Sequence, residues 1–378
     1  MLFSDVIGQA AVKERLISGT REGRVSHALL FFGPKGSGTL PMARAFAQFL
    51  NCENPGESDS CGKCPSCIKS RKMIHPDIHF IYPIATVKDV KNPKSIDFVD
   101  DWRKLAFNQP YLDLNDWIQY IVGEESKQGF ISAEESNDII RKISLKSFEA
   151  PYKVVVIWMP EKLRIEAANK LLKSLEEPPD NTIFILASEQ RDQLLATILS
   201  RTQLVKVNRL KDEEVADALR IKFDLQSSQA LELARLADGD FRIALDLAAE
   251  ERGEGSYEQE FLNWMRLCFN PMKSMEKLLP WVDEMAKEGR ESQKRFLFSC
   301  MRMVRECMLV NIGDDSLVKL DDSQLKSMVK FLPFVNQNNM HPFIQALNEA
   351  HTHVERNANP KILFLDLSLN VSRILQIK

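Results

Sequence analysis

The chain has 378 residues, of which 44% are hydrophobic and 27% are charged. This length exceeds that of one ordinary core, so about two or three domains are expected. A net charge of -3 excludes a chain whose overall positive field binds nucleic acid. No apolar run approaches a membrane span, and no basic start precedes an apolar stretch at the N-terminus, so we expect no membrane contact, no secretory signal and a cytoplasmic location.

The first distinctive stretch is FFGPKGSGTL, residues 31–40, which has the glycines of a phosphate-binding loop. A working loop reads G-x-x-x-x-G-K-[ST]: backbone N–H groups hold the phosphates, the lysine reaches the terminal ones, and the hydroxyl binds Mg²⁺. The glycines at these places are Gly33, Gly36 and Gly38. Thr39 stands at the lysine position and Leu40 at the hydroxyl position. The sequence therefore predicts a degenerate loop with no bound ATP.

The cysteines fall into two groups. Cys52, Cys61, Cys64 and Cys67 are spaced C-x8-C-x2-C-x2-C, and four thiolates so spaced can close a tetrahedron around Zn²⁺. Four sulfur ligands leave no open coordination position, so the predicted zinc is structural. Disulfides, which a cytosol disfavours, and unrelated free thiols are the alternatives. The three cysteines within 268–307 are expected to be small apolar core residues.

Apolar runs and helical periodicity alternate through the first half of the chain. Buried strands are predicted within 28–32, 79–83, 152–159 and 181–188. Helices are predicted at 39–52, 131–145 and 161–177. Continuous apolar strands alternating with helices predict an α/β fold with a parallel sheet and helices on both of its faces.

Two local features interrupt this pattern. Residues 83–130 are rich in Asp, Asn, Lys and Pro, carry Trp102, Tyr111 and Trp117, and indicate a partly helical excursion. The helix at 131–145 is expected to begin with a capping box formed by Ser132 and Glu135.

After residue 206 the strand pattern stops. Three short helices are predicted at 211–223, 227–237 and 240–250, followed by a glycine-containing join at 251–259 and amphipathic helices to the end. Three domains follow from this pattern. They are an α/β core at 1–206, with the cysteine module at 52–67 and an unusual insertion at about 83–130, then a three-helix lid at 207–250 and an all-α domain at 251–378.

Several motifs in order carry a family resemblance: FSDVIGQ, HALLFFGPKGSG, the four cysteines, HPD, NKLLKSLEEPP, TILSR and GDFRIAL. Together they resemble the clamp-loader branch of the AAA+ ATPases, and within it the delta-prime subunits of bacterial DNA polymerase III. The match covers residues 1–250 except for the excursion at 83–130, which is not part of the family pattern. For the C-terminal third only helical character and position agree. The resemblance implies an AAA+ core with a small helical lid and a helical collar for oligomerisation.

Active relatives end one strand in acidic residues that hold Mg²⁺ and position the attacking water. Trp158 and Met159 stand at those positions here. Losing these carboxylates together with the loop lysine and hydroxyl removes both charge neutralisation and water activation. The resemblance therefore implies a subunit that does not hydrolyse ATP. Trp158 is expected to be a packing residue, and Glu161 to be a first-turn helix charge, with a displaced catalytic base as the alternative.

Two arginines remain at family positions. The motif ILSRTQ places Arg201 where the family presents an arginine to the ATP of the next subunit, and the alternative is a surface salt bridge. Arg242 lies at the lid position where relatives sense nucleotide, and the alternative here is a tie between the lid and the core.

The expected function is that of a non-catalytic subunit of the DNA polymerase III holoenzyme, which helps load the sliding clamp on primed DNA. Its expected partners are the ATPase subunits and the clamp-opening subunit, with the clamp and DNA reached through the assembly. One alternative is an ATP-hydrolysing gamma/tau-like subunit. Another is a zinc-containing nucleic-acid-binding protein that uses Lys69, Arg71 and Lys72, although so short a basic run is more often a solvated face.

Overall fold

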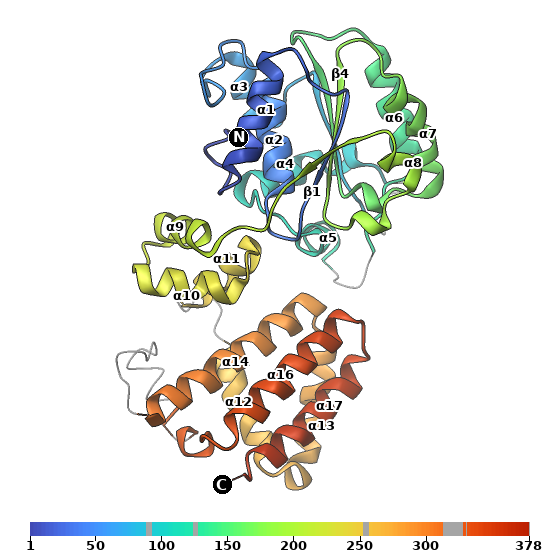
Figure 1. The fold of residues 1–378 in the computed structure, drawn as a ribbon. Coiled ribbons are helices and arrows are strands. Elements are labelled where there is room, and N and C mark those ends of the chain that lie inside the picture. The colour runs from blue at the N-terminus through green and yellow to red at the C-terminus, as the bar shows by residue number, and fades with distance from the viewer. Residues whose placement is uncertain (88–92, 124–127, 252–256, 313–327, 330, 378) are drawn as a thin grey trace. The chain divides into compact units, whose positions relative to one another are not determined.

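The computed structural model describes residues 1–87, 93–123, 128–251, 257–312, 328–329 and 331–377. The chain divides into two compact units, Met1–Arg252 and Gly253–Lys378 (Figure 1). Parts of the predicted excursion and most of the predicted glycine-containing join lie outside the described residues. Among those that are described, no helix has the length and apolar character needed to cross a membrane.

The first unit is built on a five-stranded sheet in which every neighbouring pair is parallel. Its order is β2-β3-β4-β1-β5. The strands are β1 (Ala28–Phe32), β2 (Ile78–Ile81), β3 (Lys153–Trp158), β4 (Thr182–Ser188) and β5 (Gln203–Lys206). Strands β3 and β4 are buried along their whole length, as expected where both faces of a parallel sheet are covered. The predicted α/β fold class is confirmed.

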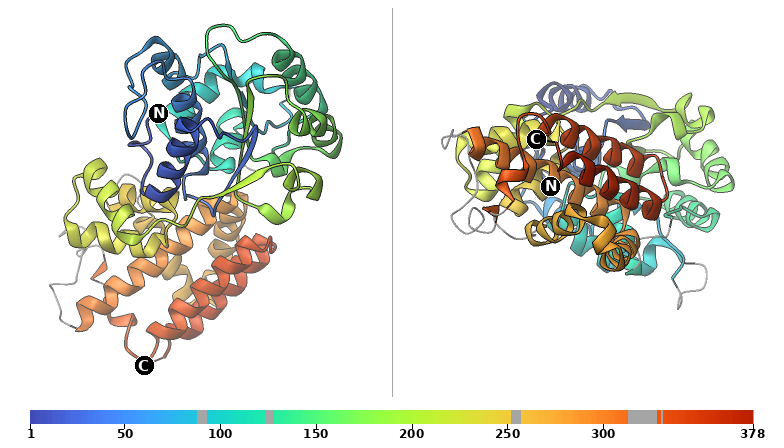
Figure 2. Two further views of the ribbon diagram at one scale, coloured as in Figure 1. Left: turned by 45° about the horizontal axis from the view of Figure 1, so that its top comes forward. Right: turned by 90° about the horizontal axis from the view of Figure 1, so that it is seen from below.

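Helices form a layer on each face of this sheet (Figures 1 and 2). One layer contains α1 (Ala10–Arg21), α2 (Thr39–Leu50) and α3 (Pro65–Arg71). The other contains α6 (Ala133–Ser144), α7 (Ile165–Glu176) and α8 (Ala196–Leu199). Alternate strand residues feed the two cores: Phe31 and Val156 belong to the first, and Leu30 and Val155 to the second.

The excursion leaves and rejoins the core at one point. A pair of hydrogen bonds, each 2.9 Å long, joins Ile84 and Phe130 across its base. Between them lie a 3₁₀ turn, η1 (Ser95–Phe98), and two helices, α4 (Val99–Asn108) and α5 (Leu114–Val122). The excursion is therefore a closed module inserted after β2.

The predicted capping box at the start of α6 is only half formed. The Ser132 hydroxyl accepts a hydrogen bond from the Glu135 N–H at 3.4 Å. The Glu135 carboxylate does not return a bond to Ser132 but accepts from the N–H of Ser95 at 2.8 Å and from its hydroxyl. The buried carboxylate therefore binds the excursion instead of the start of its own helix. The spacing of Ser132 and Glu135 in the sequence does not predict this.

Three short helices complete the first unit: α9 (Asp212–Phe223), α10 (Ser227–Ala237) and α11 (Phe241–Glu251). They form a small bundle, yellow in Figure 1. Fully buried alanines, including Ala230, Ala234 and Ala244, allow the helices to approach closely. The division of this unit into a core at 1–206 and a lid at 207–250 remains a prediction.

The second unit is helical and has its own apolar core. Its helices are α12 (Glu258–Phe269), α13 (Pro271–Lys287), α14 (Arg290–Ile312), α16 (Met340–Glu355) and α17 (Pro360–Ile374), with a 3₁₀ turn, η4 (Leu332–Phe334). Trp264 stacks on Trp281 with ring centroids 5.5 Å apart, and its N–H donates to the Ser368 hydroxyl at 2.9 Å. Three of its core residues are cysteines, as predicted: Cys268, Cys300 and Cys307.

Candidate functional site

The glycine loop joins β1 to α2 and keeps the backbone of a phosphate cradle. Gly36 has φ +67° and Gly38 has φ +97°, a region that residues with side chains rarely adopt. At Gly33, a Cβ would collide with the carbonyl oxygen of Val207. The loop glycines are therefore required by backbone shape even where phosphate-binding side chains are missing.

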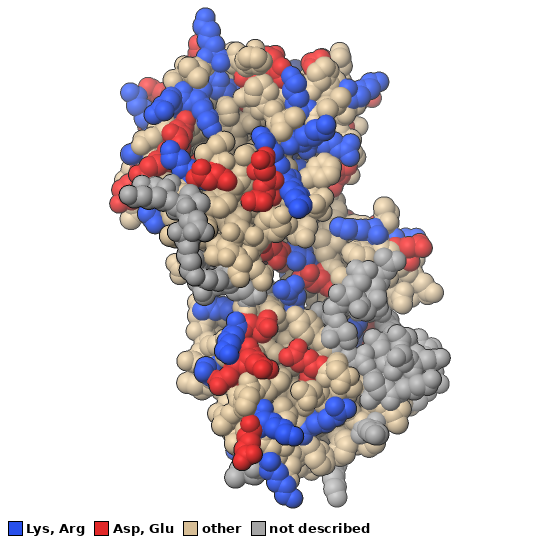
Figure 3. All heavy atoms as spheres, turned by 180° about the vertical axis from the view of Figure 1, so that it is seen from behind, with Lys and Arg blue, Asp and Glu red and all other residues tan. Residues whose placement is uncertain are grey.

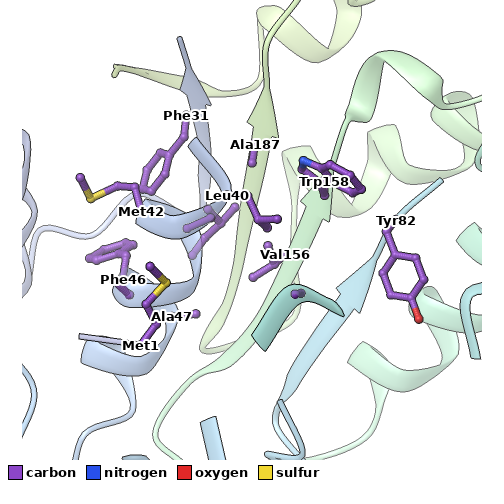
Figure 4. Close-up of a cluster of buried hydrophobic side chains, with 14 of the residues drawn as sticks. Met1, Phe31, Leu40, Met42, Phe46, Ala47, Tyr82, Val156, Trp158 and Ala187 are labelled. Atoms are coloured by element: carbon purple, nitrogen blue, oxygen red, sulfur yellow. The ribbon is translucent and has the colours of Figure 1, made fainter. Parts of the chain in front are cut away.

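The residues after the glycines point into the protein. Thr39 is 4% exposed and Leu40 is 2% exposed, and Leu40 lies in the apolar cluster with Val156 and Ala187 (Figure 4). Pro41, the third residue of α2, has no N–H, so the helix start offers one fewer amide to an anion. This loss was visible in the sequence but was not among the predictions.

The cradle is filled by side chains from elsewhere in the first unit. A Cβ added to Gly38 would lie 3.2 Å from the ring of Tyr111, and one added to Gly36 would collide with the Asp240 carboxylate. The remaining cavity has a volume of about 20 Å³, which is room for about one water molecule. No sequence motif places Tyr111 or Asp240 at this site, because both residues lie far from the loop in the chain.

Tyr111 is fixed from two sides. Its hydroxyl accepts a hydrogen bond from the N–H of Ile7 at 2.8 Å, and its ring meets the Phe241 ring edge-on at 4.8 Å. Nearby, the Lys35 ammonium lies 3.2 Å from the Asp113 carboxylate. The N-terminus, the glycine loop, the excursion and α11 therefore meet around the cradle.

The end of β3 is apolar instead of acidic. Trp158 is 1% exposed, and its ring lies 5.2 Å from that of Trp102, which stacks on Tyr82 at 4.1 Å. The structure confirms that Trp158 is a packing residue. The ring that packs on it, Trp102, comes from the excursion.

The prediction for Glu161 was wrong. Glu161 lies in a 3₁₀ turn, η2 (Pro160–Lys162), whereas helix α7 begins only at Ile165. Its carboxylate accepts a hydrogen bond from the N–H of Glu189 at 3.2 Å, and burial raises its pKa. Met159 takes a left-handed backbone conformation before the turn, which delays the start of the helix.

Carboxyl groups dominate the rim of the small cavity. Burial, followed by the charge of Asp113, raises the pKa of Glu189 to about 8. Burial also raises the pKa of Asp240, although backbone N–H groups oppose this shift. The lining also holds two cations, Lys35 and Arg242. Lys35 is paired with Asp113, and Arg242 is paired with carboxylates of its own, so both charges are already compensated without a polyanion such as a triphosphate.

The four predicted cysteines come together at a second site. Their Sγ atoms all lie within 4.8 Å of one another, and those of Cys61 and Cys67 are 4.0 Å apart. Sulfur atoms around tetrahedral zinc, with Zn–S bonds of about 2.3 Å, are about 3.8 Å apart. The cluster can therefore hold a metal such as zinc after a small contraction.

Backbone N–H groups orient these sulfur atoms. Cys61 donates to the Cys52 sulfur at 3.2 Å, Cys64 to the Cys61 sulfur at 3.3 Å and Cys67 to the Cys64 sulfur at 3.4 Å. The N–H groups of Lys63 and Cys64 lower the pKa of Cys61 to about 6, whereas burial raises the pKa values of Cys52 and Cys67. Such donors stabilise thiolates, the form that binds metal.

Arg201 lies between α8 and β5, and its side chain is 29% exposed. Its Nε and Nη2 atoms lie 2.9 and 2.8 Å from the same carboxylate oxygen of Glu176, at the end of α7. A further bond of 3.1 Å runs from Nη1 to the carbonyl of Thr197. Within one chain the guanidinium is therefore in the salt bridge that was weighed as its alternative role.

The basic run after the cysteines is partly neutralised. The Lys69 ammonium lies 2.6 Å from the Glu149 carboxylate, whereas Arg71 and Lys72 are exposed. On the face seen in Figure 3, acidic and basic side chains are interspersed, and its described residues form no continuous basic surface. With Lys69 paired to Glu149, so short a run gives little support to nucleic-acid binding on its own.

Comparison with known proteins gives the family. The sequence model of the family "DNA polymerase III, delta subunit" matches residues 8–211. The chain belongs to this family. The match spans the sheet, the cysteine cluster, the excursion and Arg201, whereas Asp240 of the glycine-loop site lies beyond it.

Relatives of this delta subunit family member carry other subunit names. DNA polymerase III subunit tau of Bacillus subtilis is 25% identical over 96% of this chain and 60% of its own length. Subunit tau of Escherichia coli is 27% identical over 67% of this chain and 33% of its own length. The chain thus spans less than two thirds of the length of either relative. A gamma subunit-related protein of Thermotoga maritima aligns over 96% of this chain and 99% of its own, with 16% identity and a TM-score of 0.42.

The raised pKa of Glu189 predicts a pH-dependent stability. The protonated Glu189 carboxyl makes its full contribution to the free energy of unfolding below the ordinary pKa of glutamate. That contribution is lost as the pH rises towards about 8. Glutamine does not titrate, so Glu189→Gln should raise the melting temperature of the protein more at roughly pH 8 than at roughly pH 5. Scanning calorimetry measures both values, with the exposed Glu14→Gln as the control. An equal difference at both pH values would show that the pKa of Glu189 is not raised in the folded protein.

Proposed function

We propose that this chain is the delta-prime subunit of a bacterial DNA polymerase III clamp loader, a cytoplasmic replication protein that does not itself hydrolyse ATP. The observation that carries the proposal is the state of the glycine loop. Its backbone cradle is kept, Thr39 and Leu40 replace the phosphate and Mg²⁺ ligands, and Tyr111 fills the space. A clamp-loader subunit with this loop has the shape to join the assembly without the chemistry to power it.

The proposed partners are the ATPase subunits and the clamp-opening subunit. The second, helical unit would provide the collar contact with them, and the clamp and primed DNA would be reached through the assembly. This follows from the order of motifs in the first unit, because no single motif there is specific enough alone.

The relatives named tau and gamma favour one alternative, an ATP-hydrolysing subunit of the same complex. Four positions argue against it here. A chain with Thr39, Leu40, Trp158 and Met159 has lost charge neutralisation and water positioning together. We therefore prefer the subunit that acts on a neighbour's ATP.

We propose that Arg201 acts on the neighbouring subunit by contacting the phosphates of its ATP. Exposed ion pairs contribute only about 0.2–1 kcal/mol, so exchange of Glu176 for phosphate oxygens is inexpensive. A guanidinium supplied in trans accelerates phosphoryl transfer by about 10³ to 10⁵ in other NTPases. Glu176 would hold Arg201 when no neighbour is present.

The experiment that tests this function replaces Arg201 in the reconstituted assembly. Arg201→Ala should lower clamp- and DNA-stimulated ATP hydrolysis several-fold, because one phosphate pocket loses its trans charge. Arg201→Lys should rescue only in part, since lysine keeps the charge but lacks the planar fork. Steady-state ATPase rates, with gel filtration confirming equal assembly, give the comparison.

The control is Arg191→Ala, because Arg191 is an exposed arginine of the first unit. It should leave the ATPase rate unchanged. Full activity of a well-assembled Arg201→Ala complex would reduce Arg201 to a structural salt bridge with Glu176.

We also propose that the cysteine cluster holds one structural Zn²⁺. The same loop anchors the N-terminus, because the Asp59 carboxylate accepts hydrogen bonds from the N–H groups of Phe3 and Ser4, each at 2.9 Å. Metal binding would thus stabilise both the loop and the start of the chain.

Protein purified without added zinc should contain close to one equivalent of metal. Cys64→Ser should lower the metal content and the melting temperature, because a structural zinc contributes folding free energy. Cys307→Ala, a core cysteine of the second unit, should keep the metal. Metal-free wild-type protein with four titratable thiols in the cluster and normal melting would rule out the site.

A further inference from the structure

The excursion is firmly seated on the core. The Arg44 side chain, 6% exposed on α2, donates to the carbonyl of Ala106 at 2.5 Å. Trp117 donates through its ring N–H to the carbonyl of Pro83 at 2.7 Å. With Trp102 packed against Trp158, helices α4 and α5 form a rigid base.

From this base, residues 109–117 extend to the glycine loop and to α11. The Asp116 carboxylate accepts from Nε of Arg242 at 2.6 Å, and both side chains are 20% exposed. Tyr111 packs against Phe241, whose N–H donates to the carbonyl of Gly36 at 3.3 Å. The segment therefore touches the loop on one side and the first turn of α11 on the other.

The ion pair between Asp116 and Arg242 of α11 is stronger than an ordinary surface ion pair. Burial lowers the pKa of Arg242, but the hydrogen bond and charge of Asp116, helped by Asp246, raise it overall. Charge-assisted bonds in a partly buried site are stronger than exposed ion pairs. Arg242 thus ties the lid helices to the core, which was one of the two roles considered for it.

We propose that residues 109–117 are a built-in latch, which fills the glycine loop and holds helices α9–α11 on the core without any nucleotide. A bound nucleotide could bridge loop and lid only while it was present. The latch belongs to the same chain, so its effective concentration at the loop is high and constant. The excursion would thus give the first unit one fixed conformation, whatever the nucleotide concentration.

Hydrogen exchange of the full-length chain tests the latch, and it does not depend on reconstitution of any complex. The variants are Asp116→Asn, which removes the charge that faces Arg242, and Tyr111→Ala, which empties the glycine loop. Asp101→Asn is the matched control, because Asp101 lies in the first turn of α4 as Asp116 lies in that of α5.

Amides of α11 should exchange about tenfold faster in Asp116→Asn, and at least as fast in Tyr111→Ala, since loss of one such bond favours opening. Amides of β3 and β4 should keep their rates, and Asp101→Asn should match the wild type. Unchanged exchange of α11 in both variants would overturn the proposal. So would an equal increase in the sheet and in α11, because that pattern reports global destabilisation.

Discussion

Gly36 and Gly38 create a space at the end of β1 that the loop itself cannot fill, and the rest of the first unit is arranged around that space. Their left-handed conformations hold the backbone open. Tyr111 enters from the excursion and Asp240 from the start of α11, so the void is closed by this chain's own atoms. Close packing of protein interiors makes such filling necessary when no ligand takes the space.

The apolar end of β3 and the excursion depend on each other, because Trp158 packs against Trp102 of the excursion. An ionised carboxylate at position 158 would be buried against the ring of Trp102, which is costly unless it is paired. Trp158 instead extends the aromatic stack of Tyr82 and Trp102. Replacing Trp158 with an acidic residue would therefore disrupt this aromatic packing and would not by itself restore ATP hydrolysis. In the proposed assembly, the fold would keep the surface that a neighbouring subunit needs, while its interior is committed to other contacts.

Much of this arrangement follows from local sequence. Continuous apolar strands predicted the parallel sheet, and the spacing of four cysteines predicted their convergence, because both patterns act over short stretches. What could not be predicted depends on contacts distant in the chain. Tyr111 packs against Gly38, and the Glu135 carboxylate accepts a hydrogen bond from Ser95 instead of capping its own helix. The spacing of residues in the sequence predicts neither contact. Glu161 was misplaced because a left-handed Met159 delays the helix, and no glycine marks that position.

We propose that the chain keeps a nucleotide-binding shape without binding nucleotide. The most direct measurement is a calorimetric titration of the purified full-length chain with MgATP, combined with a phosphate-release assay. The account predicts no saturable binding and no turnover, and none for Thr39→Lys, because the carboxylates would still be missing and Tyr111 would still fill the loop. Micromolar affinity with Mg²⁺-dependent hydrolysis, abolished by Gly38→Ala, would contradict it.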